Sequence, residues 1–192
     1  MKTPHWYLRN WEYEERLEHS GAAKRRLVYK GEYYQLSAAA MPQRRLKLVY
    51  FVLTVLLWAD LGILLTHISR GASLFFVGGA AALALIPALY LAIGCVCLLR
   101  VPTRMTYRDL RGSYLRIRTA GRWITPMMAV SLAGELFFLV FRLVNGLAVD
   151  WPGELLWLVG AGIGTLIGAL LLILYARERI EVLAAERGQE SK

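Results

Sequence analysis

Two carboxylic acids, Asp60 and Glu135, lie inside long apolar segments, where charged side chains are rare. Each follows a basic residue by thirteen positions, since Asp60 follows Lys47 and Glu135 follows Arg122. Thirteen helical residues rise about 20 Å at 1.5 Å each, which places both acids deep in a bilayer. An ionised carboxylate there costs about 2.5 to 3.5 kcal/mol on insertion scales, so each acid needs a proton, a partner or water.

Three interpretations of these acids compete. In the first, both are protonated, or paired with a base, and hold neighbouring helices together through polar contacts. In the second, they line a cavity and exchange a proton or a cation, which is the default hypothesis for intramembrane acids. In the third, tilted helices leave both acids near the outer surface. Arg142 then snorkels outward beside Glu135 or pairs with Asp60. The polar groups available as partners are Thr54, Tyr90, Ser131, Asn145 and Thr165.

No pattern typical of catalysis or of a cofactor accompanies the acids. The three histidines are scattered along the chain, and no zinc-protease, CxxC, nucleophile-elbow, P-loop or dinucleotide motif is present. We therefore expect a protein that is not an enzyme, with no catalytic residue, no metal and no cofactor.

Four apolar segments must position these residues. The chain has 192 residues, of which 57% are hydrophobic, and a mean hydropathy of +0.42. A hydrocarbon core of about 30 Å needs roughly 20 helical residues. The sequence therefore predicts an all-α integral membrane protein whose transmembrane helices lie at about residues 47–68, 73–99, 123–146 and 154–176.

Basic residues predict the orientation, because they collect on the cytoplasmic side. Ten lysines and arginines lie in residues 1–47, seven in 100–122 and four in 177–192, which leaves only Arg70 and Arg142. We expect a multi-pass protein of the plasma (inner) membrane with both termini cytoplasmic. Its parts are a cytoplasmic aromatic and basic segment (1–46), the membrane domain (47–176) with a basic loop (100–122), and a short tail (177–192).

The net charge of +9 could suggest nucleic acid in a soluble protein. Here the bases lie beside membrane spans, where anionic headgroups attract each one by about 1 kcal/mol. The expected partner is therefore the anionic bilayer surface and not nucleic acid.

The segment before the membrane begins with Thr3–Pro4, a helix start. Its aromatic residues, among them Trp6 and Trp11, lie on faces opposite the glutamates. This predicts a cytoplasmic amphipathic helix up to about residue 20 that docks on the interface, on the basic loop or on a partner. Residues 27–36, LVYKGEYYQL, carry a weak hairpin signal.

The basic loop has helical periodicity over residues 104–118, with an apolar face and an arginine face. This pattern is typical of a helix lying on a membrane surface, although a solvated loop with chance periodicity is the alternative. The residues expected to contact headgroups or a partner are Arg104, Arg108, Arg111, Arg118, Tyr107 and Tyr114, together with Trp6 and Trp11.

Two features concern assembly. RGSYLRI at 111–117 echoes YKGEYYQL at 29–36, and with the paired acids this predicts a parallel two-plus-two repeat. The gap from glycine to acid is 29 residues in one copy and 23 in the other, so chance is the alternative. The fourth helix spaces Gly160, Gly164 and Gly168 by four, which predicts close packing with the second helix or a homodimer.

Two hypotheses of function follow. The first is a non-enzymatic accessory or interaction protein whose basic and aromatic cytoplasmic face contacts lipid headgroups, or a partner that the sequence does not identify. The second is a small proton- or cation-coupled transporter that uses Asp60 and Glu135.

Overall fold

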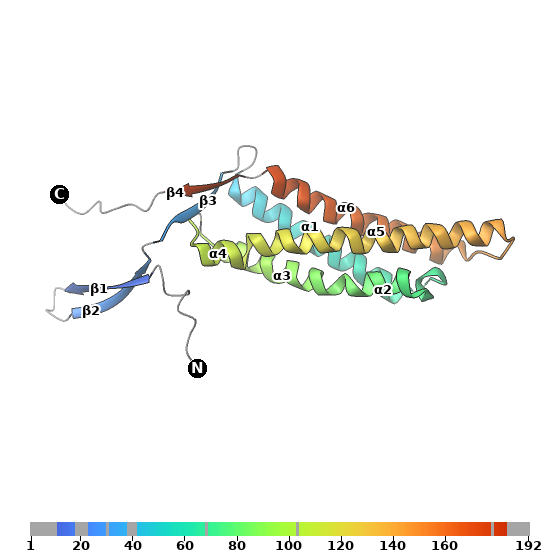
Figure 1. Ribbon diagram of the computed structural model, residues 1–192, viewed down its shortest axis with the longest axis horizontal. Coiled ribbons are helices and arrows are strands. Elements are labelled where there is room, and N and C mark those ends of the chain that lie inside the picture. The colour runs from blue at the N-terminus through green and yellow to red at the C-terminus, as the bar shows by residue number, and fades with distance from the viewer. Residues whose placement is uncertain are drawn as a thin grey trace.

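The computed structural model describes residues 11–17, 23–29, 31–37, 42–67, 69–102, 104–177 and 179–183. Four helical segments in this part of the chain are long and apolar enough to cross a membrane, as predicted. The first is α1 (Gln43–Thr66) and the last is α6 (Trp151–Arg177). Lipid offers the backbone no hydrogen-bond partner, so uncharged stretches of this length close their bonds within helices. Figure 1 shows the helices as one elongated bundle.

The second membrane segment is two helices, α2 (Phe75–Leu83) and α3 (Leu85–Arg100). They meet at Ala84, and Pro87 follows three residues later. Proline has no N–H and its ring collides with the carbonyl four residues earlier, which here belongs to Leu83, the last residue of α2. Pro87 therefore accounts for the division of this segment into α2 and α3.

The third membrane segment also has two parts, α4 (Tyr107–Gly112) and α5 (Tyr114–Val144). Thr106 and Asp109 form a capping box at the start of α4: the Thr106 hydroxyl accepts from the Asp109 N–H at 3.3 Å, and Asp109 accepts from the Thr106 N–H at 3.2 Å. Ser113 separates the two helices with φ −114° and ψ −80°. The periodic stretch 104–118 is thus helical only from Tyr107 onward, and it is not one continuous helix.

The helices form a ring of four. α5 packs against α6 and against α2 and α3, while α1 packs against α6 and α3. Neighbours around the ring run in opposite directions, as in an up-down-up-down bundle. The core inside it is apolar and includes Leu57, Leu91, Ile124 and Trp157.

The N-terminal segment corrects the predicted amphipathic helix. Residues that were expected to be helical form strand β1 (Trp11–Leu17), which pairs antiparallel with β2 (Ala23–Tyr29). The register places Glu14 opposite Arg26 and Glu15 opposite Arg25. Trp6 lies outside the described residues.

The strands on both sides of Lys30–Gly31 do not pair with each other, so the predicted hairpin is also wrong. Strand β3 (Tyr33–Ser37) instead pairs antiparallel with β4 (Arg179–Leu183) from the other end of the chain. Tyr34 and Met105 exchange two backbone hydrogen bonds of 2.8 Å. We call β3, β4, Met105 and α4 the platform, which lies at one end of the bundle, and the β1–β2 pair extends beyond it (Figure 1).

The predicted repeat finds no support. Tyr33–Ser37, in the first of the two similar segments, is a strand, whereas the second segment lies in α4 and α5. A matched pair of interfacial elements would share one conformation, and these two do not.

The glycine row of α6 is buried, but its neighbours are not those predicted. A Cβ on Gly160 would lie 2.6 Å from Leu64 of α1, and one on Gly168 would lie 3.0 Å from the backbone nitrogen of Thr125 in α5. The row thus packs on α1 and α5 and not on the second membrane segment. A homodimer through α6 stays a prediction, and it would need a face other than this one.

Candidate functional site: a buried acid cluster and a basic platform

Glu135 meets a second acid, Glu154, in the interior of the bundle. Both side chains are fully buried. Glu135 lies near the end of α5, and Glu154 lies in the first turn of α6. The two carboxyl groups are neighbours, because both lie against Gly71. A hydrogen bond between two carboxyl groups requires that one of them carry a proton, so this pair can join α5 to α6 only while it holds one.

The connection between α1 and α2 covers the acid pair. The Gly71 N–H donates to Oε2 of Glu154 at 3.4 Å, and the Ser69 hydroxyl lies near Glu135. A Cβ on Gly71 would overlap the Glu135 carboxylate. Glycine is therefore what lets this connection, which includes the short turn η2 (Gly71–Ser73), lie directly on the pair.

Asp60 is nearly buried in the interface of α1 with α6, below the acid pair. Its Oδ1 lies 3.1 Å from where a Cβ on Gly160 would stand, and its Oδ2 lies 3.1 Å from the corresponding position on Gly164. Gly160 follows Glu154 by six residues, which is about 9 Å along a helix. Glu135 and Glu154 thus lie together, and Asp60 lies about 9 Å farther along α6 inside the same bundle.

The carboxyl oxygens lack partners within the described residues. Oδ2 of Asp60, both oxygens of Glu135 and Oε1 of Glu154 are buried and accept no hydrogen bond from these residues. Buried polar atoms of this kind need a proton, an ion or water. A group of three acids, histidines or cysteines arranged to hold a metal ion does not occur in the described part of the chain.

Arg142 contacts neither acid. Its guanidinium donates to the carbonyl of Ala148 and lies 5.5 Å from the centre of the Phe138 ring. The pairing proposed for Arg142 with Asp60 is therefore absent from its contacts. Arg142 bonds to the Ala148 carbonyl because both residues lie at the end of the bundle where α5 connects to α6.

The hydroxyl and amide groups expected to satisfy the acids bond elsewhere. Ser131 accepts from Nε1 of Trp157 at 3.3 Å. Thr54, Asn145 and Thr165 each donate to the backbone carbonyl four residues earlier in their own helix. Back-bonding of this kind is the usual alternative for short polar side chains in membrane helices.

Glu154 is the member of the cluster that sequence reasoning missed. In the sequence it is only the first residue of the predicted helix 154–176, and an uncharged stretch follows it. A signal was present, since Glu154 lies three residues before Trp157 and ten before Gly164, on the broad face that the glycine row marks for burial. Extending the buried glycine face by two helical turns toward the start of the helix would have included Glu154.

The apolar face of the basic loop turns into the protein rather than toward lipid. Tyr114 is fully buried, with its ring 4.8 Å from Tyr175 and 6.4 Å from Tyr50. This burial corrects its assignment as a headgroup contact. Tyr107 remains exposed and lies 6.0 Å from Tyr34 of β3.

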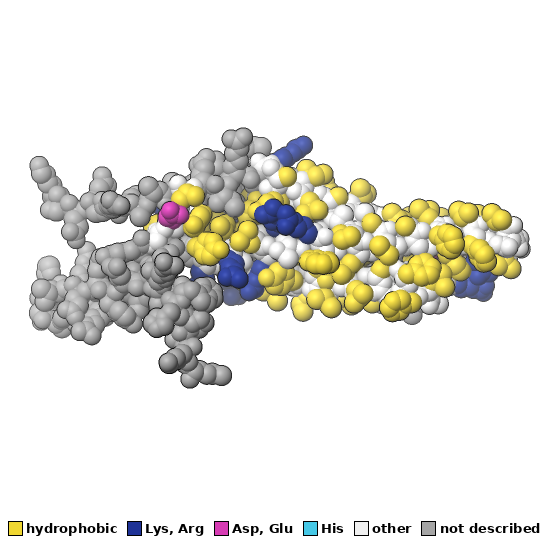
Figure 2. All heavy atoms as spheres, in the orientation of Figure 1, with side chains coloured by type: hydrophobic (Ala, Val, Ile, Leu, Met, Phe, Trp, Pro, Cys, Tyr) yellow, Lys and Arg dark blue, Asp and Glu magenta, His cyan; other side chains and the backbone are white. Residues whose placement is uncertain are grey.

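The predicted arginine face divides into two parts. Arg118 is engaged inside the protein, because it donates to the Tyr175 hydroxyl at 3.0 Å and lies 4.4 Å over that ring. Arg104, Arg108 and Arg111 are exposed. Figure 2 shows basic side chains gathered on the bundle near the platform end, next to a surface that is otherwise apolar. Nothing is described of the Trp11 side chain.

The fold and these surfaces define a four-helix protein of the membrane-spanning kind. No protein-family model, curated protein or solved structure matches the chain. Inferences about function therefore depend on the geometry alone.

Proposed function

We propose that the chain is a non-enzymatic multi-pass protein of the plasma membrane that acts as an accessory or interaction protein. Its working surface is the platform, which faces the cytoplasm. The partner carries negative charge, either as the acidic surface of a protein or as anionic headgroups. The observation that carries this proposal is the joining of three distant segments into one surface.

Three contacts support this surface. β3 comes from the segment before the membrane, β4 from the tail and Met105 from the middle loop, and backbone hydrogen bonds connect all three. Small soluble strands gain little stability in isolation, so the joining of three separated segments supports the proposal of a shared binding surface. Exposed arginines supply charge complementarity: Arg108 and Arg111 lie in α4, and Arg104 precedes Met105.

A photoreactive aromatic residue at position 107 of the full chain tests this proposal in native membranes. Tyr107 is exposed at the platform, and Leu147 is exposed at the other end of the bundle, so position 147 is the control. We expect an adduct from position 107 whose yield falls as added salt shortens the Debye length from about 10 Å at 0.1 M to 3 Å at 1 M. Its mass distinguishes a phospholipid from a protein. Equal labelling from both positions would contradict the proposal.

A second candidate function, proton or cation exchange, is favoured by one specific observation. Glu135 and Glu154 face each other with buried oxygens that lack partners in the described residues, and intramembrane acids commonly mark ion pathways. Transport also requires water to reach the acids, whereas both side chains are fully buried. For this reason we rank the candidate second.

Flux in proteoliposomes that contain a pH-sensitive dye separates the two functions. Exchange predicts a proton flux that Glu135→Gln and Glu154→Gln abolish while the fold stays intact. Asp150→Asn is the control, because Asp150 is an exposed acid four residues before Glu154. The interaction protein predicts no flux in the wild type.

A further inference from the structure

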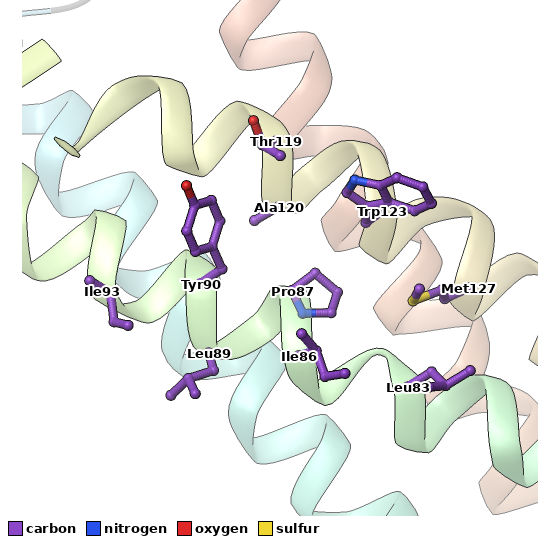
Figure 3. A pocket seen from close by; sticks show the side chains of 10 residues that line it. All are labelled: Leu83, Ile86, Pro87, Leu89, Tyr90, Ile93, Thr119, Ala120, Trp123 and Met127. Atoms are coloured by element: carbon purple, nitrogen blue, oxygen red, sulfur yellow. The ribbon is translucent and has the colours of Figure 1, made fainter. Parts of the chain in front are cut away.

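An apolar groove opens between the second membrane segment and α5 on the outside of the bundle. It encloses about 420 Å³, within the range of ligand sites. Figure 3 shows Pro87 and Tyr90 of α3 facing Ala120 and Trp123 of α5 across it. Nearly all of its lining is hydrocarbon, with hydroxyls from Tyr90 and Thr119 only.

Close helix contacts bound this groove at both ends. Toward the platform, a Cβ on Gly94 would lie 3.0 Å from Cβ of Arg116. Toward the other end, a Cβ on Gly134 would lie 2.8 Å from Val77. The break at Ala84 lies between these contacts. The helices therefore separate only over the intervening stretch, so the groove is a local and defined feature.

The length of the groove matches one leaflet. Its lining on the second membrane segment runs from Leu83 to Ile93, and ten helical residues span about 15 Å. Half of a hydrocarbon core of about 30 Å is also about 15 Å. The exposed Trp123 ring lies within it.

A basic residue marks the platform end of the groove. The guanidinium of Arg116 lies 5.3 Å over the Tyr90 ring. Arg116 precedes Ala120 by one helical turn and therefore lies on the same side of α5 as the groove lining. The groove thus has a hydrocarbon body and a cationic end at Arg116.

We propose that this groove binds one acyl chain of an anionic phospholipid from the leaflet on the platform side, with the headgroup at Arg116. The basis is the charge at one end and the leaflet-length apolar channel that follows it. The site is separate from the platform surface and from the acid pair, so it does not depend on the function proposed above.

The test uses the full chain in nanodiscs with a photoactivatable acyl chain on phosphatidylglycerol or on phosphatidylcholine. We expect labelled peptides from residues 83–93 and 119–127. Phosphatidylglycerol should be favoured about fivefold, which is the ratio that about 1 kcal/mol per basic residue gives. Labelling spread evenly over α1 and α6, or equal labelling by the two lipids, would overturn the proposal, as would a protein crosslinked in the groove.

Matched variants locate the two ends of the site. Ile86→Trp fills the groove and should remove the labelling, whereas Val159→Trp, on the exposed face of α6, should not. Arg116→Gln should abolish the preference for phosphatidylglycerol but keep labelling, and Arg177→Gln on α6 is its control. Thermal unfolding of each variant checks the fold. An unchanged preference in folded Arg116→Gln would contradict the assigned headgroup position.

Discussion

Gly168 tests the packing of α5 on α6 more sharply than any other position. A Cβ there would lie 2.6 Å from Oγ1 of Thr125, 3.0 Å from its backbone nitrogen and 3.1 Å from its Cα. Thr125 also donates to the Gly121 carbonyl at 2.8 Å, which holds its hydroxyl in place. Because two of the three atoms belong to the backbone, Gly168→Ala must push the two helices apart. Gly162 is the matched control, since a Cβ there meets nothing within 4 Å.

The magnitude follows from two opposing terms. Alanine is favoured over glycine in a helix by about 1 kcal/mol, and overpacking costs about 1 to 3 kcal/mol. Gly162→Ala should therefore stabilise the protein by about 1 kcal/mol, while Gly168→Ala should fall below Gly162→Ala by about 1 to 3 kcal/mol. Reversible unfolding in mixed micelles, followed by tryptophan fluorescence, measures the difference. Equal unfolding free energies for the two variants would refute the close contact.

Three further changes test other parts of the structure. Gly71→Ala should destabilise the bundle by about 1 to 3 kcal/mol, because its Cβ would overlap the Glu135 carboxylate, and an unchanged melting temperature would argue against the cover on the acid pair. Tyr175→Phe removes the hydrogen bond from Arg118 but keeps the ring beneath the guanidinium, so unfolding should become easier by about 0.5 to 1.5 kcal/mol, and no loss would mean that the bond is not formed. Thr106→Ala removes the capping box of α4. Amide exchange in α4 should then accelerate by the factor that corresponds to about 1 kcal/mol, while exchange in α6 should stay unchanged.

Hydrophobic runs were a sufficient guide to the membrane helices, because lipid leaves an uncharged chain of 20 residues few other structures. The division of the second segment also has a local cause in the sequence, because Pro87 cannot bond to the carbonyl of Leu83. The segment before the membrane was mispredicted because its residues fit two periods. In WEYEERL at residues 11–17, aromatic and acidic residues alternate as in a strand, yet a start signal at Thr3–Pro4 favoured a helix.

Pairings between distant segments could not be predicted from the sequence. The partner of β3 lies about 145 residues away in the tail, and no local pattern identifies it. In the acid cluster, Asp60 and Glu135 were found because they interrupt apolar runs. Glu154 was not, because it lies where a run begins. Contacts of this kind depend on how helices rotate and pack, which one sequence read along its length does not specify.

We propose that Glu135 and Glu154 form a water-free joint between α5 and α6 and that function lies at the platform. Infrared spectroscopy of the full chain in lipid bilayers, transferred into D2O, tests this claim most directly. We predict a protonated carboxyl band that exchanges slowly with deuterium and disappears in the double variant Glu135→Gln/Glu154→Gln. A band that exchanges at once would show that water reaches the acids. If the wild type lacked the protonated carboxyl band, Glu135 and Glu154 would share no proton. Fast exchange or a missing band would each contradict the proposed joint.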